Sequence, residues 1–152
     1  MKLNIVEKAL FLQNNGYYKI GHFLLALFCI EFPREVVIPK WGGGVDSIRF
    51  VHRAPGLVVH PKTSVGKRVQ FYQGVTVGKK KPWDGDEIEG GCEIQDDVIL
   101  CAGCKVLFGK EKLIVGKGTI VGANSVLIQS TGENEISAGM PAKKIGNRKI
   151  TK

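Results

Sequence analysis

The sequence predicts an all-β protein, a parallel β-helix with a short helical segment at its N-terminus. Two observations carry this prediction: from residue 59 onward apolar residues recur every six positions, and the 152 residues include 20 glycines. A repeat of six residues forms one short strand and one corner, and three repeats close a triangular coil. The chain length and its 43% apolar content suit one globular domain with a buried core.

Residues 1–34 are predicted to form one or two short amphipathic helices that cap the β-helix. Apolar residues recur there at helical spacing, the stretch Asn14-Asn15-Gly16 interrupts the pattern, and Pro33 ends it. The apolar positions are Ala9, Leu10, Leu12, Tyr17, Ile20, Phe23, Leu24 and Leu27.

The apolar run at residues 23–32 predicts neither a membrane span nor a signal peptide. A bilayer span needs roughly 20 apolar residues, and Glu31 and Pro33 stand where a small-residue cleavage site should be. We therefore expect a cytoplasmic protein. Peripheral contact of this helix with a membrane surface is the alternative to a simple helical cap.

The hexapeptide period is carried by leading residues that are followed, four positions later, by a small or β-branched residue. The leading residues are Val59, Val65, Phe71, Val77, Ile94, Leu100, Val106, Val115, Val121 and Leu127. The second set is Thr63, Val69, Val75, Val98, Cys104, Thr119 and Ser125. Gly66, Gly78, Gly116 and Gly122 directly follow leading residues, and we expect them at corners where backbone conformation or close approach excludes a Cβ atom.

Two gaps in the period predict loops. Val77 and Ile94 are 17 residues apart where the repeat requires six, so about eleven residues within 79–91 leave the coil. A shorter insertion of three residues separates Val106 from Val115. Loops on a rigid scaffold often carry function, and the first loop contains three consecutive lysines. We predict either a solvated turn, a phosphate-binding segment or a cover for a neighbouring subunit's cleft.

The net charge of +8 favours anionic partners but does not distinguish between them. Nucleic-acid binding would rest on charge alone, so we predict none. The stretch Cys101-Ala102-Gly103-Cys104 has the spacing of half a zinc or redox site. The repeat explains the two cysteines better, because Cys101 takes the glycine slot and Cys104 the small inward slot. We therefore expect reduced, structural cysteines and no metal.

The chain from about residue 45 to 146 resembles the left-handed β-helix acyltransferases. It is most similar to the serine acetyltransferase-like branch that occurs among polysaccharide-modifying O-acetyltransferases. The matching stretches are IRFVHRAPGLVVHPKTSVG (48–66), FYQGVTVG (71–78), ILCAGCKVL (99–107), IVGKGTIVGANSVL (114–127) and AGMPAKKIG (138–146). The resemblance implies a left-handed β-helix over residues 35–146 and a basic C-terminal tail, 147–152. It also implies acetyl-CoA as donor and a homotrimer with its active site between subunits.

Acetyl transfer to a hydroxyl needs a base that takes the proton as the oxygen attacks the thioester, and a histidine suits this role near pH 7. By resemblance, His52 matches the general base of the family. We expect His60, beside Pro61, and Gln73 on the substrate side or in structural roles, and His22 in the helical segment.

Donor binding in this family is largely a matter of backbone contacts. The positions that match those contacts are Gly78, Ala102 and Ala123, where small residues let the ligand approach. Lys143 and Lys144 are predicted either to meet CoA phosphates or to form a solvated basic surface.

The sequence favours an O-acetyltransferase acting on a sugar hydroxyl, such as a surface-polysaccharide precursor or a nucleotide sugar. The alternatives are a serine O-acetyltransferase of cysteine biosynthesis and a non-catalytic β-helix binding protein. The acidic partner and the second histidine of serine acetyltransferases have no clear match, since Val37 and Gly91 stand near those positions. A β-helix carbonic anhydrase is disfavoured because the chain has only three histidines, one of them in the helical segment.

Overall fold

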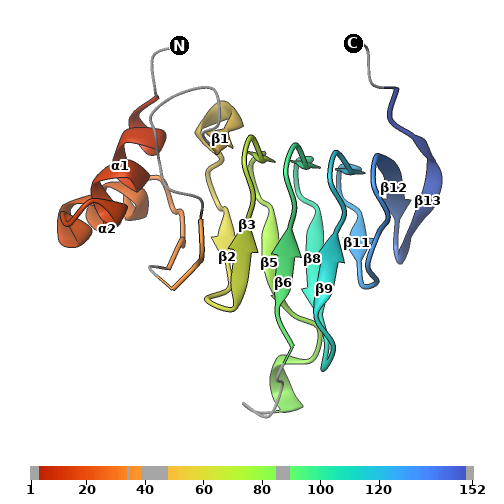
Figure 1. Cartoon of the computed structure of the whole chain (residues 1–152). Coiled ribbons are helices and arrows are strands. Elements are labelled where there is room, and N and C mark those ends of the chain that lie inside the picture. Colours follow the sequence, from red (N-terminus) through yellow and green to blue (C-terminus); the bar gives the residue numbers. More distant parts are fainter. Residues whose placement is uncertain (1–3, 34, 39–47, 85–89, 150–152) are drawn as a thin grey trace.

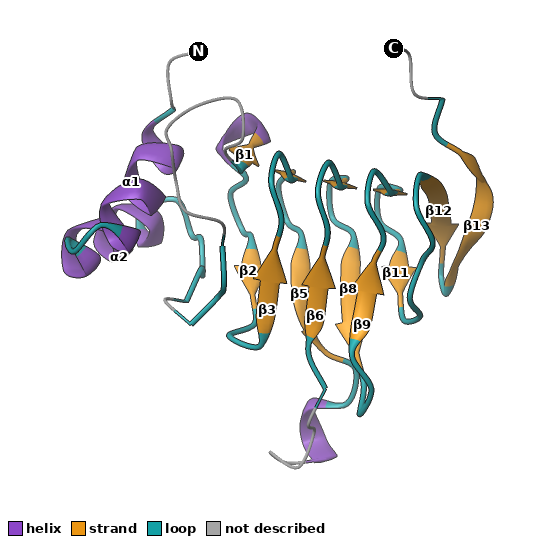
Figure 2. Ribbon diagram, in the orientation of Figure 1, coloured by secondary structure: helices purple, strands orange, loops and turns teal. Residues whose placement is uncertain are grey.

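The computed structural model describes residues 4–33, 35–38, 48–84 and 90–149. They form a left-handed parallel β-helix with two short helices at one end (Figures 1 and 2). One sheet has the order β1 (Arg49–Phe50), β4 (Gln70–Phe71), β7 (Ile99–Leu100), β10 (Ile120–Val121), β12 (Glu135–Gly139) and β13 (Ala142–Asn147). The second holds β11 (Val126–Leu127), β8 (Lys105–Phe108), β5 (Thr76–Lys79) and β2 (Val58–Val59). The third holds β3 (Thr63–Val65), β6 (Cys92–Ile94) and β9 (Leu113–Val115).

The three sheets meet at three edges of the prism. We number these edges and define each by its corner residues. The first edge, between the six-stranded and four-stranded sheets, contains residues 55–56, 73–74, 102–103 and 123–124. The second edge, between the four-stranded and three-stranded sheets, contains residues 60–62, 78–84, 109–112 and 128–130. The third edge contains residues 66–68, 95–97, 116–118 and 132–134.

The strand register confirms both predicted insertions and reveals a third. Val58 pairs with Thr76, eighteen residues on, which is three hexads. Thr76 pairs with Lys105, twenty-nine residues on, so the loop adds eleven; Lys105 pairs with Val126, twenty-one on, so the second insertion adds three. Arg49 also pairs with Gln70 at a spacing of twenty-one. Three further residues are therefore inserted between β1 and β2, in the segment that contains His52. Residues 85–89 of the predicted loop lie outside the described residues.

The core confirms the predicted repeat positions. All ten leading residues and all seven small or β-branched residues are buried. Three aromatic rings fill the N-terminal part of the core, where Phe50 stacks on Phe71 and both meet Phe32 edge to face. The period of six thus sets which side chains face inward in every coil.

Parallel pairing begins before residue 35. Glu31 bridges to Val58 and Val37 bridges to Ser64, which adds an incomplete first coil to the prism. Phe32 is buried, and Ile38, six residues later, packs against the core. The hexapeptide period therefore extends back to Phe32, a signal that the sequence analysis missed.

The predicted role of the glycines holds at some corners and not at others. A Cβ atom at Gly66 would lie 2.5 Å from the Asp96 carboxylate, and one at Gly116 would clash with the Gly132 carbonyl. Close approach explains these two. At Gly78 a Cβ atom would meet nothing within 4 Å, so packing inside the protomer gives no reason for a glycine there.

The helical segment consists of α1 (Ile5–Asn14) and α2 (Tyr18–Ala26), which are separated at the predicted break. Asn4 and Glu7 form a capping box that satisfies the first amide groups of α1. The side chain of Gln13 donates a hydrogen bond of 2.7 Å to the Phe32 carbonyl and ties α1 to the first coil.

The prediction that the helical pattern runs to Pro33 is wrong, because α2 ends at Ala26. The chain turns after α2, and Cys29 adopts a positive φ of 53° that a helix does not allow. The apolar residues at helical spacing fall into two groups, one buried and one exposed. Ala9, Leu10 and Leu25 are buried, whereas one face of α2 is exposed. The exposed apolar side chains there are Tyr17, Ile20, Phe23 and Leu27. No helix within the described residues has the length and apolar content required to cross a bilayer.

Candidate active site

His52 lies on the three-residue insertion between β1 and β2, in a 3₁₀ turn, Val51–Arg53. The preceding strand, β1, lies at the end of the prism next to the helices (Figure 1). His52, Arg53 and Ala54 have positive φ values of 53°, 64° and 44°. Three consecutive non-glycine residues in the left-handed region are unusual, and such strained backbone clusters at functional sites. The His52 side chain is exposed, and its ring meets that of Tyr72 at a centroid distance of 6.1 Å. The insertion thus carries the imidazole out of the coil.

The first edge aligns several of the predicted site residues in a ladder of backbone hydrogen bonds. The Gly74 amide donates to the Pro55 carbonyl, Gly103 to Gln73, and Asn124 to Ala102, at distances of 2.9 Å each. Gln73, Ala102 and Ala123 therefore occupy successive corners of one edge, and the His52 turn lies at its N-terminal end. A ligand along this edge would meet the small residues Ala102, Gly103 and Ala123 and the exposed Asn124 at the last two corners.

The second edge holds the remaining central candidates, His60 and Gly78. Both follow buried valines of neighbouring strands, and the His60 amide donates to the Val77 carbonyl at 2.9 Å. The space in front of Gly78 is open. Within one protomer, the four-stranded sheet separates these residues from His52. The structure therefore does not bring the two predicted histidines together.

The His60 imidazole is held in one tautomer. Its Nδ1 atom accepts a hydrogen bond of 3.1 Å from the Lys62 amide, so the proton of the neutral ring resides on Nε2. The ring also meets Phe108 edge to face at 5.1 Å. Burial lowers the pKa of His60 below its ordinary value of 6.5, and the positive charges of Lys79 and Lys62 lower it further.

We expect His60 to titrate below pH 6.5 in the folded protein, because its charged form loses hydration and faces two lysines. Replacing Lys79 with Gln should move the midpoint upward, since one of these positive charges is lost. NMR titration of the His60 ring protons in both proteins measures the shift. A midpoint at or above 6.5 in the unmodified protein would contradict the described environment.

Lys143 and Lys144 lie on β13, at the end where the hairpin of β12 and β13 turns (Figure 1). The turn is tied to the first edge because the Gly139 amide donates to the Ser125 hydroxyl at 3.0 Å. Both lysines are exposed, and Lys144 pairs with Glu135 at 3.3 Å. The predicted donor residues Ala102, Ala123 and Lys143 therefore follow one another toward the C-terminal end.

The cysteines occupy the positions that the repeat predicts. Cys104 is buried and Cys101 half-buried. Burial raises the pKa of Cys92 and of Cys104 to about 12, and it raises the pKa of Cys101 as well. Among the described residues, no group of three or more His, Cys, Asp or Glu side chains lies in a position to hold a metal ion.

We expect a thiol reagent at neutral pH to modify the exposed Cys29 first and to leave Cys92 and Cys104 unmodified until the protein unfolds. The reason is that the thiolate is the reactive species, and burial suppresses both its formation and its access. Mass spectrometry of peptides after brief labelling measures the order. Rapid modification of Cys104 in the native protein would contradict its structural role.

No protein-family model matches the chain. A serine acetyltransferase of Mycobacterium tuberculosis is 34% identical over 131 residues, covering 83% of this chain and 53% of that protein. The Haemophilus influenzae serine acetyltransferase is 34% identical over 145 residues, covering 89% of this chain and 52% of the relative. A solved serine acetyltransferase from Brucella abortus, in complex with coenzyme A, superposes with a TM-score of 0.69 at 27% identity, over 96% of this chain and 55% of that one.

This chain is a relative of the serine acetyltransferases. It belongs to the serine acetyltransferase-like branch of the left-handed β-helix proteins that the sequence motifs indicated. It spans about half the length of the curated relatives it matches.

Two positions of this serine acetyltransferase relative differ from what the family resemblance implies. Val37, near the expected acidic partner, is exposed and carries no ionisable group. Gly91, near the expected second histidine, packs so closely that a Cβ atom would lie 2.6 Å from the Lys62 carbonyl. The backbone at residue 91 therefore excludes any side chain unless it shifts, which the sequence could not reveal.

Proposed function

We propose that this chain is an acetyl-CoA-dependent O-acetyltransferase with His52 as its general base. The observation that supports this most directly is the structural similarity to a serine acetyltransferase in complex with coenzyme A, which extends over 96% of this chain. The exposed His52 imidazole accepts the hydroxyl proton of the acceptor as the oxygen attacks the thioester carbonyl. It then returns the proton to the sulfur of the leaving CoA.

The donor is proposed to lie along the first edge, with its pantetheine chain against the backbone at Ala102 and Ala123. Lys143 and Lys144 then meet the CoA phosphates near the end of the edge. Gly78 is proposed to contribute from the second edge, and the open space in front of it supports close approach of a ligand.

A second protomer is required to unite these two edges, so we propose a homotrimer with each active site between subunits. In such an assembly the first edge of one protomer faces the second edge of its neighbour, which brings His60 and Gly78 toward His52. Light scattering at micromolar protein concentration tests this, and a monomeric mass would contradict the shared site.

L-serine is the acceptor that the comparisons favour, because the curated relatives are serine acetyltransferases. The sugar hydroxyl favoured by the sequence finds no support among them. It remains the second candidate because of Val37 and Gly91, which leave the expected acidic partner and second histidine without a counterpart. Release of the CoA thiol from acetyl-CoA, measured with L-serine and with a panel of sugars and nucleotide sugars, distinguishes the two. No turnover with any acceptor, together with no affinity for CoA, would favour the non-catalytic β-helix.

Membrane contact through the exposed apolar face of α2 stays a prediction, as does the cytoplasmic location. The side chains that would enter the lipid surface include Ile20, Phe23 and Leu27, which are 55%, 63% and 62% exposed. Sedimentation of the protein with anionic lipid vesicles tests this contact.

A further inference from the structure

The C-terminal strand β13 is held by little apolar burial. Of its six residues, all of which the structure describes, Ala142 alone is buried; Lys143, Lys144 and Ile145 are exposed. The strands β8 and β9 in the middle of the prism, by contrast, alternate buried and half-buried residues throughout their length. Because apolar burial contributes most of the stability of a strand, the position of β13 depends to an unusual degree on its hydrogen bonds.

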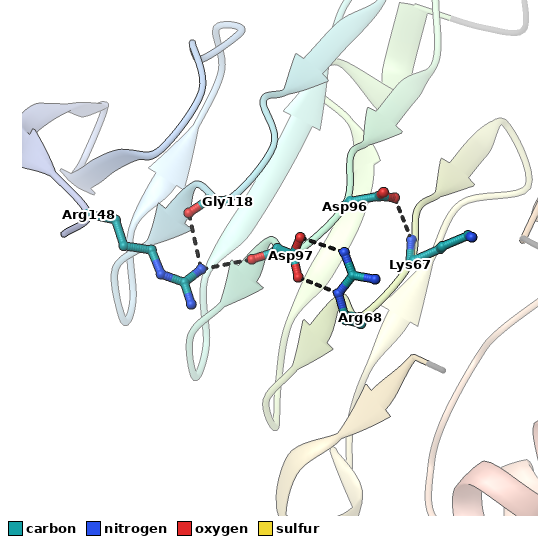
Figure 3. Close-up of polar contacts among 6 residues, drawn as sticks. All are labelled: Lys67, Arg68, Asp96, Asp97, Gly118 and Arg148. Carbon is teal, nitrogen blue, oxygen red and sulfur yellow. Dashed lines mark hydrogen bonds and ion pairs between the residues drawn. The ribbon is translucent and has the colours of Figure 1, made fainter. Parts of the chain in front are cut away.

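Arg148, directly after β13, ties the strand to three different coils. Its backbone amide donates to the Asn134 carbonyl at 2.7 Å. Its guanidinium Nη1 donates to the Asp97 carbonyl at 2.9 Å and to the Gly118 carbonyl at 3.3 Å (Figure 3). A charged donor shared between two carbonyls forms stronger hydrogen bonds than a neutral one.

Asp97, whose carbonyl accepts a hydrogen bond from Arg148, is itself held in place. The Asp97 carboxylate receives two hydrogen bonds from Arg68, at 2.6 and 2.8 Å, in the paired geometry that Figure 3 shows. The Arg68 hydrogen bond holds the pKa of Asp97 below its ordinary value. The carbonyl that accepts from Arg148 therefore belongs to a residue held from the preceding coil, and the third edge presents a rigid attachment point.

The register of β13 against β12 is irregular, and we expect the hydrogen bonds of Arg148 to maintain it. Ile136 pairs with Gly146 but Ser137 pairs with Lys144, so Ile145 is an extra residue in the ladder. A one-residue slip in a strand turns every side chain to the opposite face. Such a slip would exchange the directions of Lys143 and Lys144. The hydrogen bonds of Arg148, at the C-terminal end of the strand, oppose this slip.

We propose that Arg148 is a positioning residue that fixes the register of β13 and, through it, which of the neighbouring Lys143 and Lys144 faces the phosphates of the donor. The inference rests on the proposed use of acetyl-CoA. It assigns the third edge a role in donor affinity, although the donor itself lies along the first edge.

The experiment compares Arg148→Ala, Arg148→Lys and the control Leu113→Ala with the unmodified protein. Amide hydrogen exchange, measured by mass spectrometry without any ligand, should accelerate in peptides of β13 in Arg148→Ala and remain unchanged in the central coils. The KM for acetyl-CoA should rise about tenfold in Arg148→Ala, the equivalent of one lost hydrogen bond, with kcat within about twofold. Arg148→Lys should recover part of the loss, because an ammonium group reaches one of the two carbonyls.

Leu113→Ala removes a buried side chain from β9 but leaves Arg148, its acceptor carbonyls and the Arg68–Asp97 pair in place. It should lower thermal stability without raising the KM for acetyl-CoA. An equal rise in KM in both variants would overturn the inference, since a general loss of stability would then explain it. Unchanged exchange of β13 in Arg148→Ala would overturn it as well. If the unmodified protein shows no affinity for CoA by calorimetry, the proposed function fails, and the link from Arg148 to the donor fails with it.

Discussion

Replacing His52 with Asn lowers the rate of acetyl transfer by about 10²–10⁴-fold, the usual contribution of a positioned general base. Asn is the sharpest replacement because residue 52 has a φ of 53°, and Asn adopts this left-handed conformation more readily than Ala. The variant therefore removes the base and preserves the backbone of the turn. His52→Ala should show the same loss, with an additional small cost in stability.

Affinity for CoA should be retained in His52→Asn, because the proposed donor contacts lie at Ala102, Ala123 and Gly78. Calorimetry with CoA and a thiol-release assay measure the two properties separately. His60→Ala is the matched control, since it removes an imidazole from a different edge, and its activity should fall much less. A His52→Asn variant that keeps most of the activity would exclude His52 as the base.

Replacing Phe71 with Ala should lower the free energy of unfolding by about 3–5 kcal/mol, as expected for an aromatic residue deleted from a packed core. The Phe71 side chain is fully buried. Its ring stacks on Phe50 at a centroid distance of 6.1 Å and meets Phe32 edge to face at 6.3 Å. Its removal leaves a cavity between the first coils that rigid neighbouring strands cannot close.

Chemical denaturation at a fixed protein concentration measures this loss, since stability depends on concentration if the protein is oligomeric. Phe71→Leu should cost less, because most of the volume is kept. Trp83→Ala is the control for removal of a large aromatic side chain. The Trp83 side chain is 75% exposed, so we expect a change within about 0.5 kcal/mol. A loss in Phe71→Ala as small as that of the control would contradict the described core.

Several residues of the candidate site could be predicted from the sequence, but their arrangement in space could not. Resemblance pointed to His52, Ala102 and Ala123, and the structure places Ala102 and Ala123 at successive corners of one edge, with the His52 turn at its end. Gly78 was predicted as a donor contact together with Ala102 and Ala123, and His60 as a substrate-side or structural residue, but both lie on another edge. A corner ladder follows from residue spacing, whereas the distance between two edges depends on how the coils close.

Arg148 was not singled out by the sequence, because nothing in its local context distinguishes it from the other basic residues near the C-terminus. Its role depends on two carbonyl groups that lie 51 and 30 residues earlier in the chain. The three-residue insertion at His52 was missed for a different reason. The leading residues before Val59 were not recognised, so the interval from Phe50 could not be compared with the period.

The β-helix, its inward-facing residues and the insertions after Val77 and Val106 could be predicted from the sequence, because a period of six is a local property that each hexad repeats. The end of α2, the start of the first coil, the reason for a glycine at residue 91 and the attachment of the C-terminal strand could be seen only in the folded chain. The last three depend on contacts between coils. Gly91 packs against the Lys62 carbonyl, and Arg148 reaches carbonyl groups of two earlier coils, and such contacts leave no pattern along the chain.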